Sequence, residues 1–387
     1  QAGAAGGKIV AEGTISDIKE NPNSIIAPFL SGKAKLRRTS RPALKQMFDN
    51  GIIKLATRNI HTVQPLAVNI PKGRMTAVTG VSGSGKTTLI LESLIPALEA
   101  AINGKKLPEH IVSIEANGIK QIKLIDATPI GINIRSTVAT YANVHDELRK
   151  IFSKTDDAKK LGYKAGDFSY NTGKLRCPVC DGTGIINLDV QFLPDVEIPC
   201  PDCRGARYAK LADNVKYISK SGEAFSLPEL MEMDINSALK ACKDLKIVSQ
   251  RLKVLQNLGL GYLTLGEETP GLSGGEAQRL KLASEMGKGQ ADSVFVFDEP
   301  TTGLHFHDIK KLLEAFEALI SRGHTIIIIE HNMDVIKCAD HVIDLGPEGG
   351  NMGGNLVVAG TPEEVAACVA SYTGQFLKEK LAMDSPD

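Results

Sequence analysis

Gly80-Val-Ser-Gly-Ser-Gly-Lys86-Thr87 has the pattern G-x-x-x-x-G-K-T of a phosphate-binding loop. Met75–Thr79 before it reads as a buried strand, and Thr88–Ala101 after it reads as an amphipathic helix. Glycines let successive backbone N–H groups turn towards phosphate oxygens, and the N-terminus of the following helix favours the same anion. A glycine-rich turn could match the pattern by chance, but the order strand, loop, helix favours a nucleotide site.

The loop residues have distinct expected roles in binding ATP and Mg²⁺. Lys86 would reach the β- and γ-phosphates, and the hydroxyl of Thr87 would coordinate Mg²⁺. The residues of this segment that we expect to contact the nucleotide are Gly80, Val81, Ser82, Gly83, Ser84, Gly85, Lys86, Thr87 and Thr88.

The composition is that of a globular protein without a charge bias. The chain has 387 residues, 42% of them hydrophobic, with 45 basic and 45 acidic side chains. This length is typical of two or three domains, and the zero net charge means that nucleic-acid binding would need a local patch. No apolar run reaches membrane-spanning length and no signal-peptide pattern opens the chain. The seven cysteines do not form a secreted disulfide framework, so a reduced, cytoplasmic setting is expected.

Four cysteines form a candidate metal module. Cys177-Pro-Val-Cys180 and Cys200-Pro-Asp-Cys203 are two C-x-x-C knuckles, and glycines follow each of them. Four thiolates suit tetrahedral Zn²⁺, whereas a dithiol redox site would explain only one of the pairs. Because four cysteines leave no open coordination position, we expect a structural zinc. Ile185–Phe192 and Val196–Pro199 would form a hairpin between the knuckles, with Leu193-Pro-Asp195 at its tip.

A second anion site and two carboxylates follow later in the chain. Leu272-Ser-Gly-Gly-Glu-Ala-Gln-Arg279 opens a helical stretch that runs to Met286, and Ser273, Gly274 and Gly275 would bind phosphate at its N-terminus. A simple helix cap is the alternative for Ser-Gly-Gly. The apolar strand Val294–Phe297 ends in Asp298 and Glu299, where Asp298 would hold Mg²⁺ through water and Glu299 would act as general base.

A histidine ends the next predicted strand. Thr325–Ile329 consists of β-branched residues, and Glu330-His331 follows it. The carboxyl ends of parallel strands are where doubly wound sheets bind ligands, so we expect His331 to contact the γ-phosphate. A lone histidine is otherwise a core or surface residue, and for His305 and His307 the surface remains the default. Strand Gln121–Ile125 and helices Val144–Phe152 and Ile309–Ile320 complete the α/β pattern.

The two ends of the chain resemble each other. Gly3-Ala-Ala-Gly-Gly-Lys-Ile-Val-Ala-Glu-Gly-Thr14 aligns without a gap to Gly350-Asn-Met-Gly-Gly-Asn-Leu-Val-Val-Ala-Gly-Thr361. This self-similarity predicts a duplicated architecture, in which an ATPase half precedes the one present here. The expected organisation is a tail of that half (1–33), a linker (34–49), a first part of the ATPase core (50–152), an inserted helical and zinc-binding domain (153–258) and a second core part (259–387). The basic residues of Lys33–Lys45 favour a solvated linker over a phosphate-contacting patch.

These motifs resemble those of the ABC-type ATPases, and their order is similar to that of the UvrA family of bacterial nucleotide excision repair. Segments that carry the likeness further are Phe192-Leu-Pro-Asp-Val196, Asp298-Glu-Pro-Thr-Thr-Gly-Leu-His305, Glu330-His-Asn332 and Ile343-Asp-Leu-Gly-Pro-Glu-Gly-Gly350. The resemblance covers essentially the whole chain. It implies an ABC-type fold with an inserted signature domain, and two ATPase halves that face head to tail.

The resemblance also implies partners and one departure. The family dimerises, binds damaged DNA through its zinc-bearing insertions, passes it to a helicase-like partner of the UvrB type and does not cut DNA itself. Asp126-Ala-Thr-Pro-Ile-Gly131 replaces the family's Asp-Gln-Ser-Pro-Ile-Gly. Ala127 lacks the hydrogen-bonding side chain of the Q-loop glutamine, so slow hydrolysis and a divergent paralogue are expected. The alternative function is an ATPase subunit of a transporter or a drug self-resistance system that never binds DNA; a chromosome-organising ATPase would need coiled coils that are not present.

Overall fold

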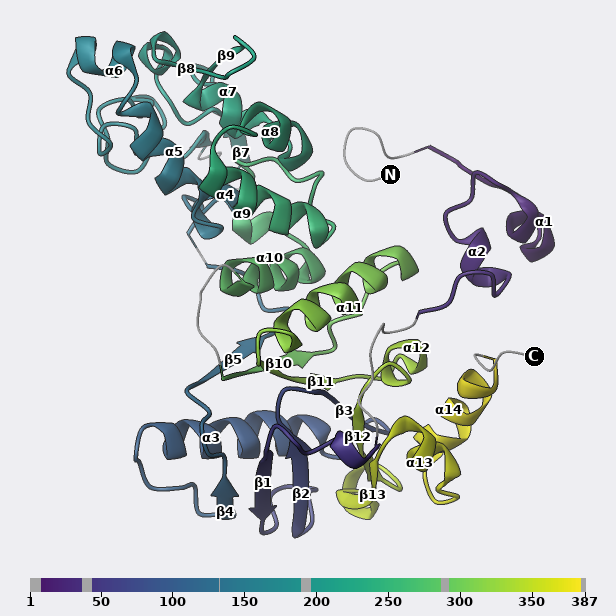
Figure 1. Ribbon diagram of the computed structural model, residues 1–387. Coiled ribbons are helices and arrows are strands. Elements are labelled where there is room, and N and C mark those ends of the chain that lie inside the picture. The colour runs from purple at the N-terminus through teal and green to yellow at the C-terminus, as the bar shows by residue number, and fades with distance from the viewer. Residues whose placement is uncertain (1–7, 37–43, 132, 189–195, 287–291, 384–387) are drawn as a thin grey trace. The chain divides into compact units, whose positions relative to one another are not determined.

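The phosphate-binding loop follows a central strand of a six-stranded sheet (Figure 1). The computed structural model describes residues 8–36, 44–131, 133–188, 196–286 and 292–383. The strand order is β13-β12-β3-β11-β10-β5, and all neighbours are parallel except β12 and β13. The expected α/β class with a mostly parallel sheet is confirmed. The strands are β3 (Met75–Gly80), β5 (Gln121–Ile125), β10 (Ser293–Asp298), β11 (Thr325–Ile329), β12 (His341–Gly346) and β13 (Asn355–Gly360).

The central strands are almost completely buried, because helices and a second sheet cover the faces of the parallel sheet. All five residues of β11 are buried, and β3 and β10 are buried up to their last residue. A three-stranded antiparallel sheet lies beside them, with the order β2-β1-β4. One core, which includes Leu55, Leu89 and Val296, joins this sheet to the helix after the loop and to the six-stranded sheet. The three strands are β1 (Ile52–Thr57), β2 (Leu66–Pro71) and β4 (Ile111–Glu115).

The chain divides into two compact units, each of which is described by itself. One comprises Gln1–Lys8 and Thr128–Lys288, and the other comprises Ile9–Ala127 and Gly289–Asp387. Both sheets described above belong to the second unit, which we call the nucleotide unit. Its helical segments are α1 (Ile15–Glu20), α2 (Ala27–Leu30), η2 (Leu44–Gln46), η3 (Thr88–Leu94), α3 (Ile95–Ile102), α11 (Phe306–Ile320), α12 (Met333–Ile336), η6 (Gly350–Met352), α13 (Pro362–Ala367) and α14 (Tyr372–Ala382).

The first unit, which we call the cysteine unit, is mainly helical with two short hairpins. It contains both the four cysteines and the helix that starts at Gly274, so it is wider than the range 153–258 expected for the insertion. Its elements are α4 (Val138–Tyr141), α5 (Val144–Phe152), α6 (Asp156–Leu161), β6 (Ile185–Leu188), β7 (Val196–Pro199), η4 (Lys210–Asn214), β8 (Lys216–Ile218), β9 (Ala224–Ser226), α7 (Leu227–Glu232), α8 (Ile235–Ala241), α9 (Lys246–Asn257), η5 (Thr269–Gly271) and α10 (Gly274–Met286).

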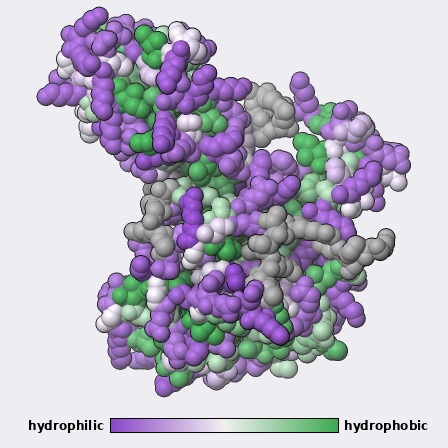
Figure 2. All heavy atoms as spheres, viewed as in Figure 1, coloured by the Kyte–Doolittle hydropathy of each residue, from purple (hydrophilic) through white to green (hydrophobic). Residues whose placement is uncertain are grey.

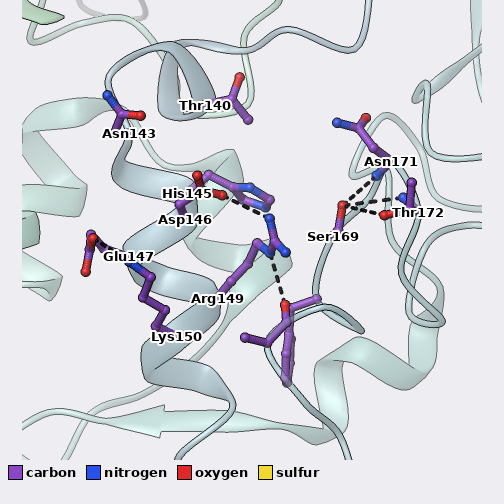
Figure 3. A network of polar contacts seen from close by, with 12 residues as sticks. Thr140, Asn143, His145, Asp146, Glu147, Arg149, Lys150, Ser169, Asn171 and Thr172 are labelled. Atoms are coloured by element: carbon purple, nitrogen blue, oxygen red, sulfur yellow. Dashed lines mark hydrogen bonds and ion pairs between the residues drawn. The ribbon is translucent and has the colours of Figure 1, made fainter.

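Polar side chains cover one face of α5, while its other face is buried. Arg149 donates from Nη1 to Asp146 at 2.9 Å and from Nε to the carbonyl of Ala165 at 3.0 Å, and Lys150 pairs with Glu147 at 3.0 Å (Figure 3). Val144, His145, Leu148 and Phe152 are buried on the other side. The polar and buried positions follow the helical period, as expected for an amphipathic helix with one face in the core.

The short helix α6 depends on its two ends for stability. Thr155 caps α6, because its side chain accepts a hydrogen bond from the backbone N–H of Ala158, and Gly162 ends the helix in a left-handed conformation. Capping residues and a charged first turn thus stabilise a helix that has one buried residue.

The sequence repeat corresponds to a repeated helix start. Thr14 caps α1 in a capping box with Asp17, and Thr361 caps α13 in a capping box with Glu364. The aligned residue before each cap is a glycine that packs directly against the acidic side chain. Residues 3–7 of the repeat lie outside the described residues, as do residues 37–43 of the basic segment and the hairpin tip Leu193–Asp195.

Hydrophilic residues predominate on the surface that Figure 2 shows, with apolar residues scattered between them. In the described part of the chain, no helix is both long and apolar enough to cross a membrane.

Candidate functional site

The phosphate-binding loop connects β3 to η3 in the nucleotide unit. Gly80 has φ 132°, and a Cβ atom there would lie 2.0 Å from the carbonyl oxygen of Leu345, so only glycine fits. Lys86 is buried, and its Nζ donates to the carbonyl oxygens of Gly80 at 3.0 Å and Val81 at 2.8 Å. Burial lowers the pKa of the Lys86 ammonium, against the opposing effect of nearby Glu299. The ammonium thus occupies the concave side of the loop, where phosphate oxygens could replace the two carbonyls.

The loop is braced by a segment whose role the sequence analysis did not recognise. Gly349 packs so closely that a Cβ atom would lie 2.4 Å from the carbonyl oxygen of Ser82, and the N–H of Gly350 donates to Gly83 at 3.1 Å. Ser84 is fully buried and its hydroxyl has no hydrogen-bond partner. Thr87 is exposed and is the N-cap residue directly before η3, and the hydroxyl of Thr88 donates to Oε1 of Glu92 at 3.1 Å. The hydroxyl of Thr88 is thus engaged by Glu92, whereas Thr87 is an exposed threonine directly after Lys86.

Two carboxylates and a histidine lie at the ends of neighbouring strands. Asp298 ends β10, and burial together with the charges of Glu299 and Asp126 raises the pKa of its carboxyl. Glu299 has φ 43°, a left-handed conformation that is unusual for a residue with a side chain. Nε2 of His331, just after β11, lies 3.5 Å from Oε1 of Glu299. The structure thus brings Asp298, Glu299 and His331 together, and the charges of both carboxylates act on Lys86.

The carboxylate of Asp344 is buried beside the strand of the phosphate-binding loop, a position that the sequence alone does not indicate. Asp344, in β12, accepts hydrogen bonds from Thr79 at 2.7 Å, Ser371 at 2.6 Å and Thr373 at 2.7 Å. It therefore ties the strand of the phosphate-binding loop to α14. The only signal available in the sequence was the position of an aspartate inside an apolar strand.

The Ser-Gly-Gly motif begins α10 in the cysteine unit. The N–H and hydroxyl of Ser273 both donate to Oε2 of Glu276 at 2.7 Å. The N–H of Glu276 in turn donates to the hydroxyl oxygen of Ser273 at 3.4 Å. Tyr262 donates to the other carboxylate oxygen. Burial raises the pKa of Glu276, but the hydrogen bonds from Tyr262 and Ser273 outweigh it and leave that pKa below its ordinary value. Gly274 and Gly275 form the first turn, so their N–H groups lie at the end of a helix of 13 residues.

The Q-loop segment is tied to the same helix. Nζ of Lys281, in α10, donates to the carbonyl oxygen of Thr128 at 2.9 Å and to its hydroxyl at 2.8 Å. Ala127, the preceding residue, is exposed. The methyl side chain of Ala127 offers neither a donor nor an acceptor at the Q-loop position.

The four predicted metal ligands form one cluster in the cysteine unit. Their Sγ atoms all lie within 4.8 Å of one another, with 3.9 Å between Cys177 and Cys200 and 3.6 Å between Cys180 and Cys203. Four sulfurs at about 2.3 Å from a tetrahedral zinc would be about 3.8 Å apart. The donor set and its spacing therefore fit Zn²⁺. All seven cysteines are free thiols, and Cys242 and Cys338 are buried away from this cluster.

Two arginines contact the first cysteine knuckle, a role that the sequence alone does not indicate. Arg207 is buried, its carbonyl accepts from the N–H of Cys177 at 2.9 Å, and its guanidinium pairs with Glu268 at 2.7 Å. Arg135 donates to the carbonyl and the carboxylate of Asp181 at 2.8 and 3.0 Å. These contacts join the knuckle to the chain on either side of the cysteine pairs.

The chain is similar to UvrA proteins over nearly its whole length. It is 45% identical to the UvrABC system protein A of Borreliella burgdorferi over 98% of this chain and 40% of that protein, and 44% identical to that of Micrococcus luteus over 99% of this chain and 38% of that protein. The crystal structure of UvrA2 from Deinococcus radiodurans superposes with a TM-score of 0.87 and 37% identity, over 98% of this chain and 45% of that one. No protein-family model matches the chain. The chain spans about two fifths of the length of the curated relatives. With an ABC ATPase-like α/β fold and a four-cysteine cluster, it is a homologue of the UvrA family.

Proposed function

We propose that this chain belongs to a UvrA-like, DNA-binding ABC ATPase that acts in nucleotide excision repair. The observation that supports the proposal best is the meeting of Lys86, Asp298, Glu299 and His331 at the carboxyl ends of adjacent strands of one sheet. A charged ammonium, two carboxylates and an imidazole at one edge are the groups that phosphoryl transfer to water requires.

Each residue has a role that follows from its position. The N–H groups of the glycine loop would hold the phosphates of ATP, and Lys86 would exchange its two carbonyl partners for β- and γ-phosphate oxygens. Thr87 and Asp298 would hold Mg²⁺, which neutralises charge on the phosphate oxygens when bound. Glu299 would accept a proton from the attacking water, and His331 would contact the γ-phosphate. Ser273, Gly274 and Gly275 would bind the γ-phosphate of a nucleotide held on another ATPase half.

The cysteine unit is proposed to hold one structural Zn²⁺ through Cys177, Cys180, Cys200 and Cys203. All four ligand positions are thiolates, so the metal would shape the fold and would have no open coordination position for substrate. Reduced thiols are also the reason why we propose a cytoplasmic location. Damaged duplex DNA, a helicase-like partner of the UvrB type and a second copy of the full-length protein are the proposed partners, because the relatives are named as UvrABC system proteins.

DNA binding by the full-length protein tests this function. Lys86→Ala should abolish the ATP-dependent change in affinity for damaged duplex DNA, whereas the control Lys106→Ala, at an exposed lysine, should leave it intact. Binding should weaken steeply as salt rises, because phosphate contacts release counterions. ATP hydrolysis without any salt-dependent DNA binding would instead support the transporter or self-resistance alternative.

A further inference from the structure

Glu330 lies between β11 and His331, and its carboxylate accepts four hydrogen bonds although it is almost completely buried. It is 3% exposed. Oε1 accepts from the N–H of Thr301 at 3.1 Å and from the hydroxyl of the same residue. Oε2 accepts from the N–H groups of His331 at 2.8 Å and Asn332 at 2.9 Å. Each oxygen therefore holds a different segment of the chain.

Both segments are attached to catalytic candidates. Thr301 belongs to the turn after Glu299, and its neighbour Thr302 donates from its hydroxyl to Oε2 of Glu299 at 3.3 Å. The other segment carries His331, and Nε2 of its imidazole lies 3.5 Å from Oε1 of Glu299. The Glu330 side chain thus connects the turn after Glu299, the proposed general base, to the backbone of His331, the proposed phosphate contact.

Backbone bonds connect the same residue to the loop strand. The N–H of Glu330 donates to the carbonyl of Val78 in β3 at 3.2 Å, and the N–H of Glu299 donates to Ile329 at 3.0 Å. The ends of three neighbouring strands, which lead to the phosphate-binding loop, to Glu299 and to His331, are therefore linked around Glu330. This also explains how the surroundings maintain the left-handed backbone of Glu299, since such conformations persist only where several contacts impose them.

We propose that Glu330 is a positioning residue for ATP hydrolysis, whose buried carboxylate sets the placement of Glu299 and His331 relative to each other. This inference rests on the proposed function. A carboxylate suits the role because two oxygens can each accept two hydrogen bonds, whereas an amide has one oxygen and one donor group. A glutamine here would direct its NH₂ group at one of the two pairs of donors.

The test measures Lys86-dependent ATP hydrolysis, which is the rate of the full-length protein minus the rate of its Lys86→Ala variant. Glu330→Gln should lower kcat for this part by between about tenfold and a hundredfold, because a small misplacement of reacting groups has an effect of this size. The KM for ATP should stay within about twofold, since the variant leaves Lys86 and the glycine loop unchanged. The control Glu314→Gln, at an exposed position of α11, should match the wild type.

A second pair of variants keeps the test informative if Glu330→Gln folds poorly. Thr301→Val removes the hydroxyl at constant shape and should lower kcat with unchanged KM, whereas Thr301→Ser retains the hydroxyl and should behave as the wild type. Unchanged kcat in both Thr301→Val and Glu330→Gln would overturn the inference about Glu330 but not the proposed function. A loss of rate that matches the loss of folded protein would also overturn it. Absence of any Lys86-dependent hydrolysis in the wild type would overturn the proposed function as well.

Discussion

Nε2 of His331 lies 3.5 Å from Oε1 of Glu299, and both side chains are about half exposed, at 48% and 51%. The contact joins the ends of two strands that are neighbours in the sheet. Because neither group is enclosed, water and a phosphate group can approach both of them. The two side chains thus lie where Glu299 could accept a proton from water and His331 could contact a phosphate group, which are the roles proposed for them.

Ala127→Gln should increase the rate of ATP hydrolysis severalfold. Ala127 is exposed and directly follows Asp126, whose charge acts on Asp298. A glutamine would supply the donor and acceptor that the Q-loop position lacks, close to the proposed metal ligand. Steady-state hydrolysis with saturating ATP checks this, and Ala127→Leu, which adds bulk without hydrogen bonds, should show no increase. Equal rates in all three proteins would contradict the interpretation of Ala127 as a lost Q-loop contact.

Metal analysis should find one zinc per chain, and Cys177→Ser should lose it. Three thiolates and a hydroxyl bind zinc more weakly than four thiolates, and a structural zinc contributes directly to folding. The cysteine unit should therefore become sensitive to proteolysis. Cys368→Ser provides the control, since Cys368 is a partly exposed cysteine outside the cluster. Full zinc content in Cys177→Ser would rule out the four-thiolate site.

Arg207→Ala should destabilise the protein by about 3 kcal/mol, because it leaves Glu268 without its buried partner. The guanidinium side chain is only 4% exposed, whereas Glu268 is 32% exposed. Denaturant unfolding monitors this loss. The double variant with Glu268→Gln should recover part of it, since the unpaired carboxylate is then removed. Strict additivity of the two single variants would mean that the pair contributes no coupling energy.

Stability should decrease as the pH falls below about 6.5, partly through His145. Burial lowers the pKa of His145 to about 3, and Nε2 lies 2.7 Å from the hydroxyl oxygen of Tyr208. That hydroxyl donates to Phe168 at 2.9 Å, so the neutral histidine carries its proton on Nε2. The unfolded chain binds a proton near pH 6.5 and the folded chain does not until about pH 3. The free energy of unfolding thus falls between these values, by up to about 1.4 kcal/mol per pH unit.

His145→Phe should remove the contribution of His145 to the pH dependence of the free energy of unfolding. The variant should also lower the stability at neutral pH, because the hydrogen bond to Tyr208 is lost. Chemical unfolding at several pH values would measure both effects. His341, whose pKa burial lowers to about 4, contributes in the same direction, so the variant should reduce the pH dependence without abolishing it. An unchanged slope below pH 6 would contradict the assignment.

Local patterns in the sequence were enough to predict the elements that carry the site. Five β-branched residues predict β11 with its observed bounds, and the G-x-x-x-x-G-K-T pattern predicts the strand, loop and helix around Lys86. Arg207 with Glu268, Glu330 with Thr301, and Asp344 with Thr79 could not be predicted in this way. Each pair joins residues that are distant in the chain, and only the fold decides which buried charge meets which donor. Helix α6 has one buried residue, so its caps stabilise it and no apolar periodicity marks it in the sequence.

The two capping boxes separate what the start of a helix needs from what its packing needs. Thr14 and Asp17 bond to each other as Thr361 and Glu364 do, although no residue of α1 is buried while α13 buries Pro362 and Val365. The bonds of a helix start are made within four residues, so they need no agreement with the rest of the protein. Packing depends on many distant partners. The same helix start can therefore occur in two segments of the chain whose surroundings differ.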